Sequence, residues 1–167
     1  MKSTLVGFVL GVVFSVFGLV YYLTRVMPVK TEGGPVPFEW KIAHSAVHHA
    51  IGADADKASP LPLDGATLAA GAHIYREQCA LCHGDLGRPP SPTAKGMFPD
   101  PPQLLPPQTG VTDDPVGETY WKVRNGIRMT GMPGYVATLS DTEIWQVSMF
   151  LAHADKLPPP ALEILKR

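Results

Sequence analysis

The sequence predicts an all-α protein in which three main helices form one domain behind a transmembrane helix. An uncharged run of 22 residues, Ser3 to Thr24, predicts the membrane helix. Three later segments, near residues 64–78, 115–126 and 140–154, combine helix-capping signals with apolar residues at helical spacing. The many prolines (18) and glycines (16) indicate long connecting loops rather than a large sheet.

The apolar run decides the expected topology. As a helix it would be about 33 Å long, enough to cross a hydrocarbon core of about 30 Å. A cleaved signal peptide is the competing interpretation, but its apolar region usually holds about 7–15 residues and precedes a small-residue cleavage site. Here the run is longer, and Tyr-Leu-Thr-Arg-Val-Met-Pro follows it without such a site. We therefore predict an uncleaved, single-pass anchor over residues 1–25.

Residues 26–62 are expected to form a linker that contains a short helix near 38–52. Its first part is rich in proline and glycine. His44 and His48 would share a helix face at a spacing that can hold a metal ion, but no carboxylate or cysteine completes a set. A face that meets a partner subunit or the membrane surface is the alternative for these two residues and His49.

The domain itself is predicted over residues 63–155. Asp64 is a suitable N-cap for its first helix, Pro115 suits the first turn of the second, and Ser140 with Glu143 forms a capping-box pattern before the third. Residues 84–111 hold eight prolines and show no helical or strand period. A loop of that length in a compact domain is usually functional. Residues 156–167 are expected to be a C-terminal tail.

Cys79 and Cys82 are the two cysteines of the chain, and His83 follows directly. Cys-x-x-Cys-His is the haem-attachment pattern, in which both thiols form thioethers with the porphyrin and the histidine reaches the iron. A thiol–disulfide motif also uses Cys-x-x-Cys, but the histidine and the lack of a βαβ pattern argue against it. We therefore predict one covalently attached haem c.

The expected location follows from this attachment, which takes place outside the cytoplasm in bacteria. The haem domain should lie on the periplasmic face of the bacterial cytoplasmic membrane. Counting basic residues beside the span mildly favours the opposite orientation, since Lys2 precedes it while Arg25 and Lys30 follow it. We give the requirement for haem attachment outside the cytoplasm more weight than this count of basic residues.

Several spaced motifs show that residues 63–155 resemble the class I cytochrome c family. Gly71, Tyr75 and Cys79 match its Gly-x-x-x-aromatic-x-x-x-Cys pattern, and Phe150 matches the aromatic partner of that glycine. The segments 124–127, 131–135 and 139–141, with Trp145, look like the part that carries the second axial ligand. The resemblance implies a cytochrome c fold wrapped around one haem. It is closest to Pro-rich-loop, single-haem members found with respiratory and dehydrogenase complexes.

By this resemblance Met132, directly before Pro133, is the second axial ligand. Met129 lies three residues away and is the alternative, whereas Met97 and Met149 are expected to be packing residues. Arg88 could pair with a haem propionate or face solvent.

Trp145 could contact the haem or only fill the core. His73 and His153 are expected at the surface or near the propionates. A haem with two histidine ligands would require one of these two residues to replace Met132.

The function expected is electron transfer without bond chemistry, hence no enzyme activity. The protein would act as a tethered carrier or as a subunit of a respiratory or dehydrogenase complex. A haem enzyme or gas sensor, such as a peroxidase, is the alternative, and it requires an open sixth coordination position. The net charge of −1 argues against a nucleic-acid partner. Four cations are expected to steer an acidic redox partner: Lys95, Lys122, Arg124 and Arg128.

Overall fold

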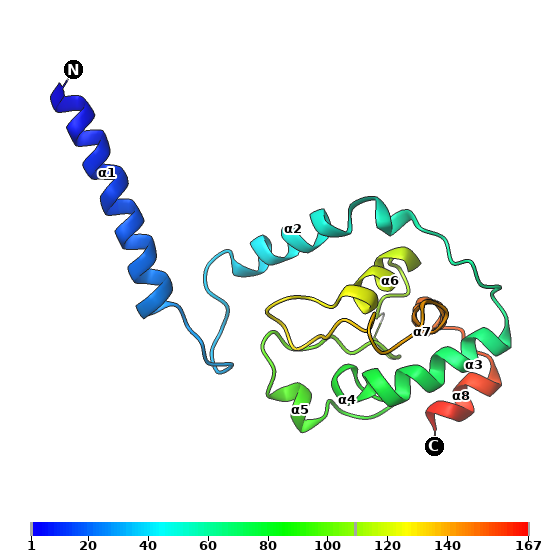
Figure 1. Ribbon diagram of the computed structural model, residues 1–167. Helices are drawn as coiled ribbons and strands as arrows, with labels where there is room; N and C mark the ends of the chain where they lie inside the picture. The colour runs from blue at the N-terminus through cyan, green and yellow to red at the C-terminus, as the bar shows by residue number, and fades with distance from the viewer. Residues whose placement is uncertain (1, 109, 167) are drawn as a thin grey trace. The chain divides into compact units, whose positions relative to one another are not determined.

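Helices make up all the regular secondary structure in the part of the chain that the computed structural model describes, residues 2–108 and 110–166 (Figure 1). The all-α prediction is therefore confirmed. The chain divides into two units, one ending at Lys30 and one beginning at Thr31. Each unit is described separately below.

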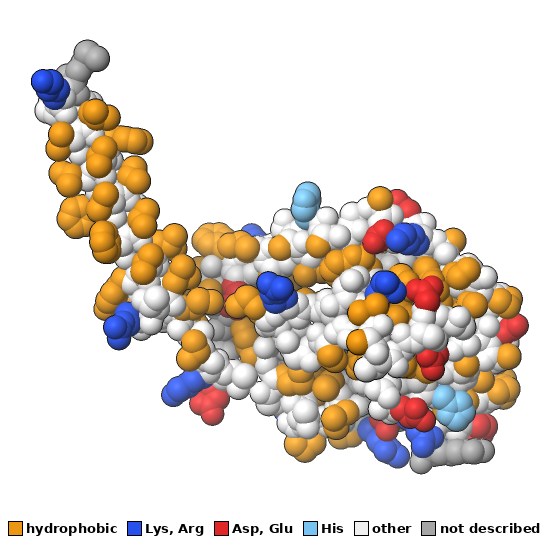
Figure 2. Space-filling model, in the orientation of Figure 1, with side chains coloured by type: hydrophobic (Ala, Val, Ile, Leu, Met, Phe, Trp, Pro, Cys, Tyr) orange, Lys and Arg blue, Asp and Glu red, His pale blue; other side chains and the backbone are white. Residues whose placement is uncertain are grey.

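The first unit is a long apolar helix. Helix α1 spans Lys2–Tyr21 and continues as a π-helical turn over Tyr22–Val26. None of the described side chains of α1 is buried, and hydrophobic side chains line the face seen in Figure 2. With 25 residues, Lys2–Val26 is long and apolar enough to cross a membrane. A signal sequence near an N-terminus meets the same criteria.

The second unit begins with a segment that was expected to be linker. The predicted short helix is present as α2, Glu39–Ile51, followed by a 3-10 turn over Gly52–Asp56. Ile51 is only 3% exposed, and the turn lies against helix α6, Val116–Asn125. The residues just before position 63 therefore pack with the domain that follows.

The three main helices occur where capping signals predicted them: α3 (Gly65–Ile74), α6 and α7 (Asp141–Ala152). Asp64 Oδ1 accepts a hydrogen bond from the Thr67 amide at 2.8 Å. The capping box is complete, because the Glu143 amide donates to Ser140 Oγ at 3.3 Å and the Ser140 amide donates to Glu143 Oε2 at 2.7 Å. Such caps satisfy backbone groups that a helix end leaves unpaired.

Helix α3 leads directly to the cysteines. It continues through a π-helical turn, Tyr75–Cys79, into the short helix α4, Ala80–His83. The Pro-rich segment then runs irregularly apart from one short helix, α5, Pro92–Lys95. The proximity of α4 and α5 places this segment beside the cysteine-bearing helix.

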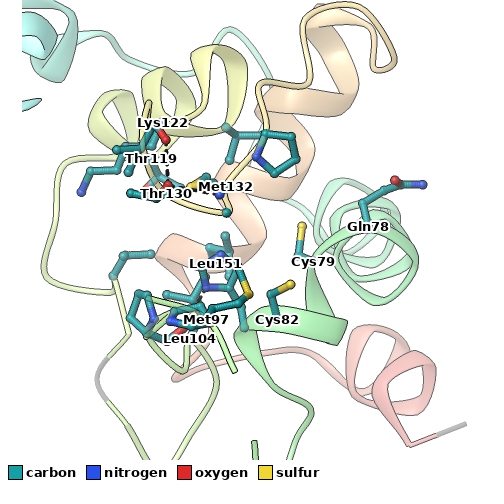
Figure 3. A pocket seen from close by; sticks show the side chains of 18 of the residues that line it. Gln78, Cys79, Cys82, Met97, Leu104, Thr119, Lys122, Thr130, Met132 and Leu151 are labelled. Carbon is teal, nitrogen blue, oxygen red and sulfur yellow. Dashed lines mark hydrogen bonds between the residues drawn. The ribbon is translucent and has the colours of Figure 1, made fainter. Parts of the chain in front are cut away.

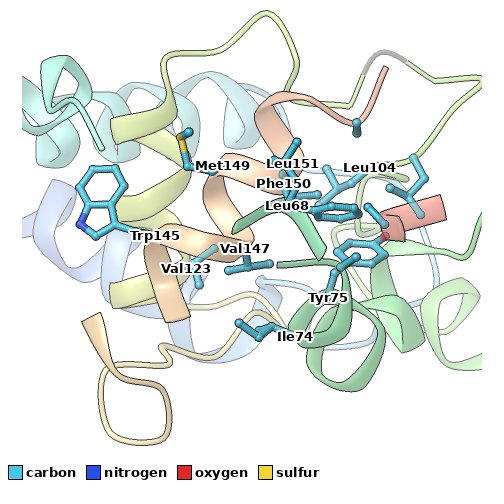
Figure 4. Packing of buried hydrophobic residues seen from close by; sticks show 14 of the residues in the cluster. Leu68, Ile74, Tyr75, Leu104, Val123, Trp145, Val147, Met149, Phe150 and Leu151 are labelled. Carbon is cyan, nitrogen blue, oxygen red and sulfur yellow. The ribbon is translucent and has the colours of Figure 1, made fainter. Parts of the chain in front are cut away.

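Helices α3 and α7 cross closely at Gly71, and buried side chains of both helices belong to the core, among them Tyr75's partner Phe150 (Figure 4). A Cβ atom on Gly71 would lie 2.2 Å from the Gln146 carbonyl oxygen and 2.6 Å from Phe150 Cβ. One turn later the rings of Tyr75 and Phe150 pack with centroids 5.4 Å apart, both fully buried. The predicted contact between Gly71 and Phe150 is therefore present.

The C-terminal residues differ from the expected tail, because Pro159–Leu165 form helix α8, which packs on α3. Ala161 is completely buried, and the Arg76 guanidinium donates to the Ile164 carbonyl at 2.7 Å. The run of three prolines suggested a break, but two of them occupy the first turn of α8. Proline is tolerated there because the first amides of a helix need no partner inside it.

The helix crossing can be tested with Gly71→Ala. We expect it to lower the free energy of unfolding by about 1–3 kcal/mol, because the added methyl group must push two backbones apart. Gly65→Ala is the matched control, since a Cβ there meets nothing within 4 Å. It should be neutral or stabilising by less than about 1 kcal/mol. Guanidinium unfolding followed by circular dichroism measures both, and equal effects would contradict the account.

Candidate haem pocket

An apolar pocket of about 220 Å³ opens beside the cysteine motif (Figure 3). Five parts of the chain line it: the end of the α3–α4 segment, the Pro-rich segment, α6, the irregular segment after α6, and α7 through Leu151. The prediction that the Pro-rich segment wraps around a bound group is consistent with this position, since Met97, Pro102 and Leu104 form part of the wall.

Cys79, Cys82 and His83 all line this pocket, so the structure brings the predicted attachment motif together. Cys79 ends the π-helical turn, and Cys82 and His83 lie in α4, so both thiols come from one continuous helical segment (Figure 3). Both cysteines are free and partly buried. Leu81 between them is 64% exposed, so the helical segment that bears both thiols reaches the surface here.

The His83 ring is oriented by the Pro-rich segment. Its Nδ1 lies 2.8 Å from the Pro102 carbonyl oxygen. A carbonyl only accepts, so Nδ1 carries the proton and Nε2 keeps its lone pair. Burial lowers the pKa of His83, partly offset by this hydrogen bond. The ring is therefore held neutral, in the tautomer that a metal ligand needs.

The backbone around His83 is also secured. The Tyr75 hydroxyl donates to the Gly84 carbonyl at 2.6 Å, and the Leu104 amide donates to the His83 carbonyl at 3.1 Å. These bonds join the core, α4 and the Pro-rich segment. His83 is thus held by contacts from three parts of the domain, so its orientation does not depend on a bound group.

Met132 lines the pocket from the segment that follows α6. The Ile127 amide donates to the Met132 carbonyl at 3.2 Å, and the Met132 amide donates to Thr130 Oγ1 at 3.1 Å (Figure 3). The Tyr135 hydroxyl donates to the Gln78 carbonyl at 2.8 Å, which ties this segment to the residue before Cys79. Met129, the alternative ligand, is 82% exposed.

Thr119 supplies a polar group without a partner on the pocket wall. The residue is 4% exposed, and its Oγ1 has no hydrogen-bond partner among the residues that the structure describes. A buried hydroxyl costs free energy unless it is hydrogen-bonded, so this position is suited to a polar atom of a bound group. Lys122, one turn later, is held by Glu118 at 2.6 Å.

The structure places Arg88 and Trp145 away from the pocket wall. Among the described residues that line the pocket, neither is present. Arg88 is 65% exposed and pairs with Asp85 at 3.1 Å, three residues before it. Trp145 is 5% exposed and stacks on Tyr120 with ring centroids 4.0 Å apart. Trp145 is therefore a core residue, and the local ion pair accounts for Arg88.

The remaining histidines lie elsewhere. On α2 the rings of Trp40, His44 and His48 follow one another, with centroids 4.7 and 4.2 Å apart, and His49 is exposed nearby. His153 Nδ1 bonds to the Met149 carbonyl at 2.9 Å. Within the described residues no group of three or more His, Cys, Asp or Glu side chains could hold a metal ion.

Three features of the pocket were not expected from the sequence. Pro102 acts through a backbone carbonyl, which no side-chain pattern reveals. Thr119 lies four residues before Val123, and that helical spacing could have indicated a shared face toward the pocket. Met97 was expected to be a packing residue, and it lies on the pocket wall.

These groups fit a covalently attached haem. Two thiols, a neutral imidazole with a free Nε2 and a thioether share one apolar pocket, and a buried hydroxyl there lacks a partner. They do not fit a thiol–disulfide centre. Burial, and secondarily the neighbouring Cys82, raises the pKa of the unattached Cys79 thiol to about 12, whereas redox cysteines have lowered pKa values.

Comparison with known proteins agrees with this chemistry. The family described as cytochrome c oxidase, cbb3-type, subunit III matches residues 66–151. A thiosulfate dehydrogenase of Stutzerimonas stutzeri (strain A1501) is 30% identical over 106 residues, 62% of this chain and 32% of that relative. The chain thus spans about a third of the relative's length.

A solved structure, the reducing HAO-like protein complex of Kuenenia stuttgartiensis, is similar with a TM-score of 0.48 and 25% identity. The similarity covers 57% of this chain and 47% of that one. The family match, in contrast, extends over more than half of this chain and includes the cysteine motif and Met132. The chain therefore belongs to this family, and its second unit contains a cytochrome c domain.

Proposed function

We propose that the protein is a membrane-anchored, single-haem electron carrier whose haem iron is ligated by His83 and Met132. One observation carries the proposal. A neutral His83 with its Nε2 free and the Met132 thioether line the same apolar pocket as the two attachment cysteines. A haem with both axial positions filled by the protein has no position for a substrate, which favours electron transfer.

Each part of the pocket has a defined task in this function. Haem c supplies an iron centre that changes oxidation state by one electron. Cys79 and Cys82 tether the group, and the Pro102 carbonyl keeps His83 in the ligating tautomer. Ligation by Met132 together with His83 raises the reduction potential, and the apolar wall adds to this by excluding water.

The pocket walls give less support to a haem enzyme. A peroxidase-like site needs an acid–base group beside an open coordination position. Of the described acidic and basic side chains on the wall, other than His83, Lys122 is paired with Glu118, and Asp100 is exposed. Neither is a buried group poised to exchange a proton.

The exposed edge of the pocket is where we expect electrons to enter and leave. Leu81, between the two cysteines, offers an apolar contact there. Two of the four predicted steering cations are already paired, Lys122 with Glu118 and Arg124 with Asp141 at 3.3 Å. Lys95 and Arg128 are both exposed. The same edge would serve a tethered carrier and a subunit of a respiratory or dehydrogenase complex.

The proposed location is the periplasmic face of a bacterial cytoplasmic membrane. The apolar helix Lys2–Val26 supports anchoring in the membrane. The formation of thioethers outside the cytoplasm supports the periplasmic side for the haem domain. A retained anchor would hold the haem domain near its redox partners and raise their effective concentration.

Ligation can be tested on the purified, haem-loaded protein. We expect a low-spin haem that shows the ferric Met–iron charge-transfer band and does not bind carbon monoxide when reduced. Met132→Ala should lose the band and bind carbon monoxide, because it removes the sixth ligand. Met129→Leu, which changes an exposed methionine, is the control and should match the wild type. Ready carbon monoxide binding by the wild type would instead support an enzyme or sensor.

Covalent attachment can be tested by substituting the cysteines. Cys79→Ala/Cys82→Ala should yield protein whose haem separates from the chain on a denaturing gel, since both thioethers are gone. Leu81→Ala, inside the same motif, should keep its haem on the chain. Haem that stays covalently bound to the double variant would refute the assignment.

The anchor can be tested in cells. We expect the mature protein in the membrane fraction, resistant to carbonate extraction, with an intact mass that includes Lys2–Val26. The C-terminal unit should be degraded by protease added to spheroplasts. A shorter, soluble periplasmic form would show that the apolar helix is a cleaved signal sequence.

A further inference from the structure

Met97 lies directly against the residue that precedes Met132. A Cβ atom on Gly131 would be 1.9 Å from the Met97 methyl carbon and 3.5 Å from its sulfur. The Met97 side chain therefore occupies the place that any larger residue at position 131 would need. Met97 and Met132 both line the pocket, and Figure 3 shows them together with the two cysteines.

The position of Met97 is coupled to the cysteine-bearing helix. Its amide donates to the Ala94 carbonyl at 3.2 Å, at the end of α5. Ser91 caps α5 by accepting from the Ala94 amide at 3.0 Å, and its hydroxyl donates to the Leu81 carbonyl in α4 at 2.5 Å. A short chain of bonds thus runs from α4 through α5 to Met97.

The segment on which Met97 rests is tied at its C-terminal end by Tyr135, which bonds to Gln78 and Val123, while the part nearer Met129 is held by bonds among its own residues. Ile127 and Thr130 bond to Met132, and Met129 has a φ of 63° with its side chain in solvent. Arg128, Met129 and Gly131 are exposed, and a surface segment of this kind can open locally between its tethers. A side chain from the Pro-rich segment that packs on Gly131 opposes that opening.

We propose that Met97 is a positioning residue that keeps the Met132 segment closed over the haem. This inference rests on the proposed function, because it takes Met132 as the ligand. An unbranched thioether can fill an irregular gap without a directional bond, and glycine at 131 provides the gap. Met97 thus links the Pro-rich segment to the Met132 segment, and both segments line the pocket.

The test measures how fast imidazole binds to the ferric protein, because imidazole must wait for the Met132 segment to open. The full-length, haem-loaded protein in detergent is used throughout. Met97→Ala should speed imidazole binding about tenfold or more, since it removes the packing on Gly131. Met97→Leu keeps most of the volume and should stay within about threefold of the wild type. Met129→Leu is the control for an exposed methionine and should not change the rate.

A second substitution makes the contact itself testable. Gly131→Ala alone should speed binding less than Met97→Ala does, because its methyl group displaces only the flexible end of the Met97 side chain. In the Met97→Ala background the same methyl group enters vacated space, so the double variant should bind imidazole more slowly than Met97→Ala does. The effect of Gly131→Ala on the imidazole-binding rate should therefore change sign between the two backgrounds. Such a change is expected only for two residues in direct contact. A purely global loss of stability would make the double variant the faster one.

One further result would overturn the inference without touching the proposed function. A Met97→Ala rate equal to that of the wild type, with the charge-transfer band intact, would show that Met97 does not restrain the segment. Loss of the band in Met97→Leu and its retention in Met132→Leu would instead overturn the inference and the Met132 assignment together, because Met97 would then be the ligand. Failure of the proposed function would look different, because the wild type itself would then lack the band.

Discussion

The close crossing of α3 and α7 at Gly71 is the constraint on which the rest of the domain depends. Because the two backbones meet there, Tyr75 is buried against Phe150 one turn later, and its hydroxyl reaches the Gly84 carbonyl just beyond His83. The helical segment that bears both cysteines is thus an extension of the best-packed part of the core. The small domain can hold a flat apolar group because its attachment motif starts from a rigid base.

Much of this fold could be predicted, because its signals are local or have a fixed spacing. Asp64 and the pair Ser140 and Glu143 mark helix starts by hydrogen bonds within three residues, and the structure contains these bonds. The role of Gly71 was available from the resemblance to the class I cytochrome c family, whose Gly-x-x-x-aromatic-x-x-x-Cys pattern it matches. Helix α8 was missed because a run of prolines looks the same in sequence at a helix start and at a break. Only tertiary packing on α3 distinguishes the two cases.

The candidate site was predictable where covalent chemistry fixes the spacing, and less so elsewhere. Cys79, Cys82 and His83 are consecutive parts of one motif and share one pocket. Arg88 and Trp145 stay predictions as haem contacts; in the structure Arg88 pairs with Asp85 and Trp145 stacks on Tyr120. The Pro102 carbonyl and the Met97 contact join segments far apart in the chain. No single-sequence pattern carries that information.

The central claim is that His83 and one methionine, Met132, complete the coordination of a single haem iron. X-ray absorption at the iron edge of the ferric, haem-loaded protein tests it most directly, because it reports the atoms bonded to iron. The account predicts five nitrogen neighbours and one sulfur neighbour, with the sulfur lost in Met132→Ala. A spectrum with no sulfur neighbour, whether five-coordinate or with nitrogen or oxygen as the sixth atom, would contradict it.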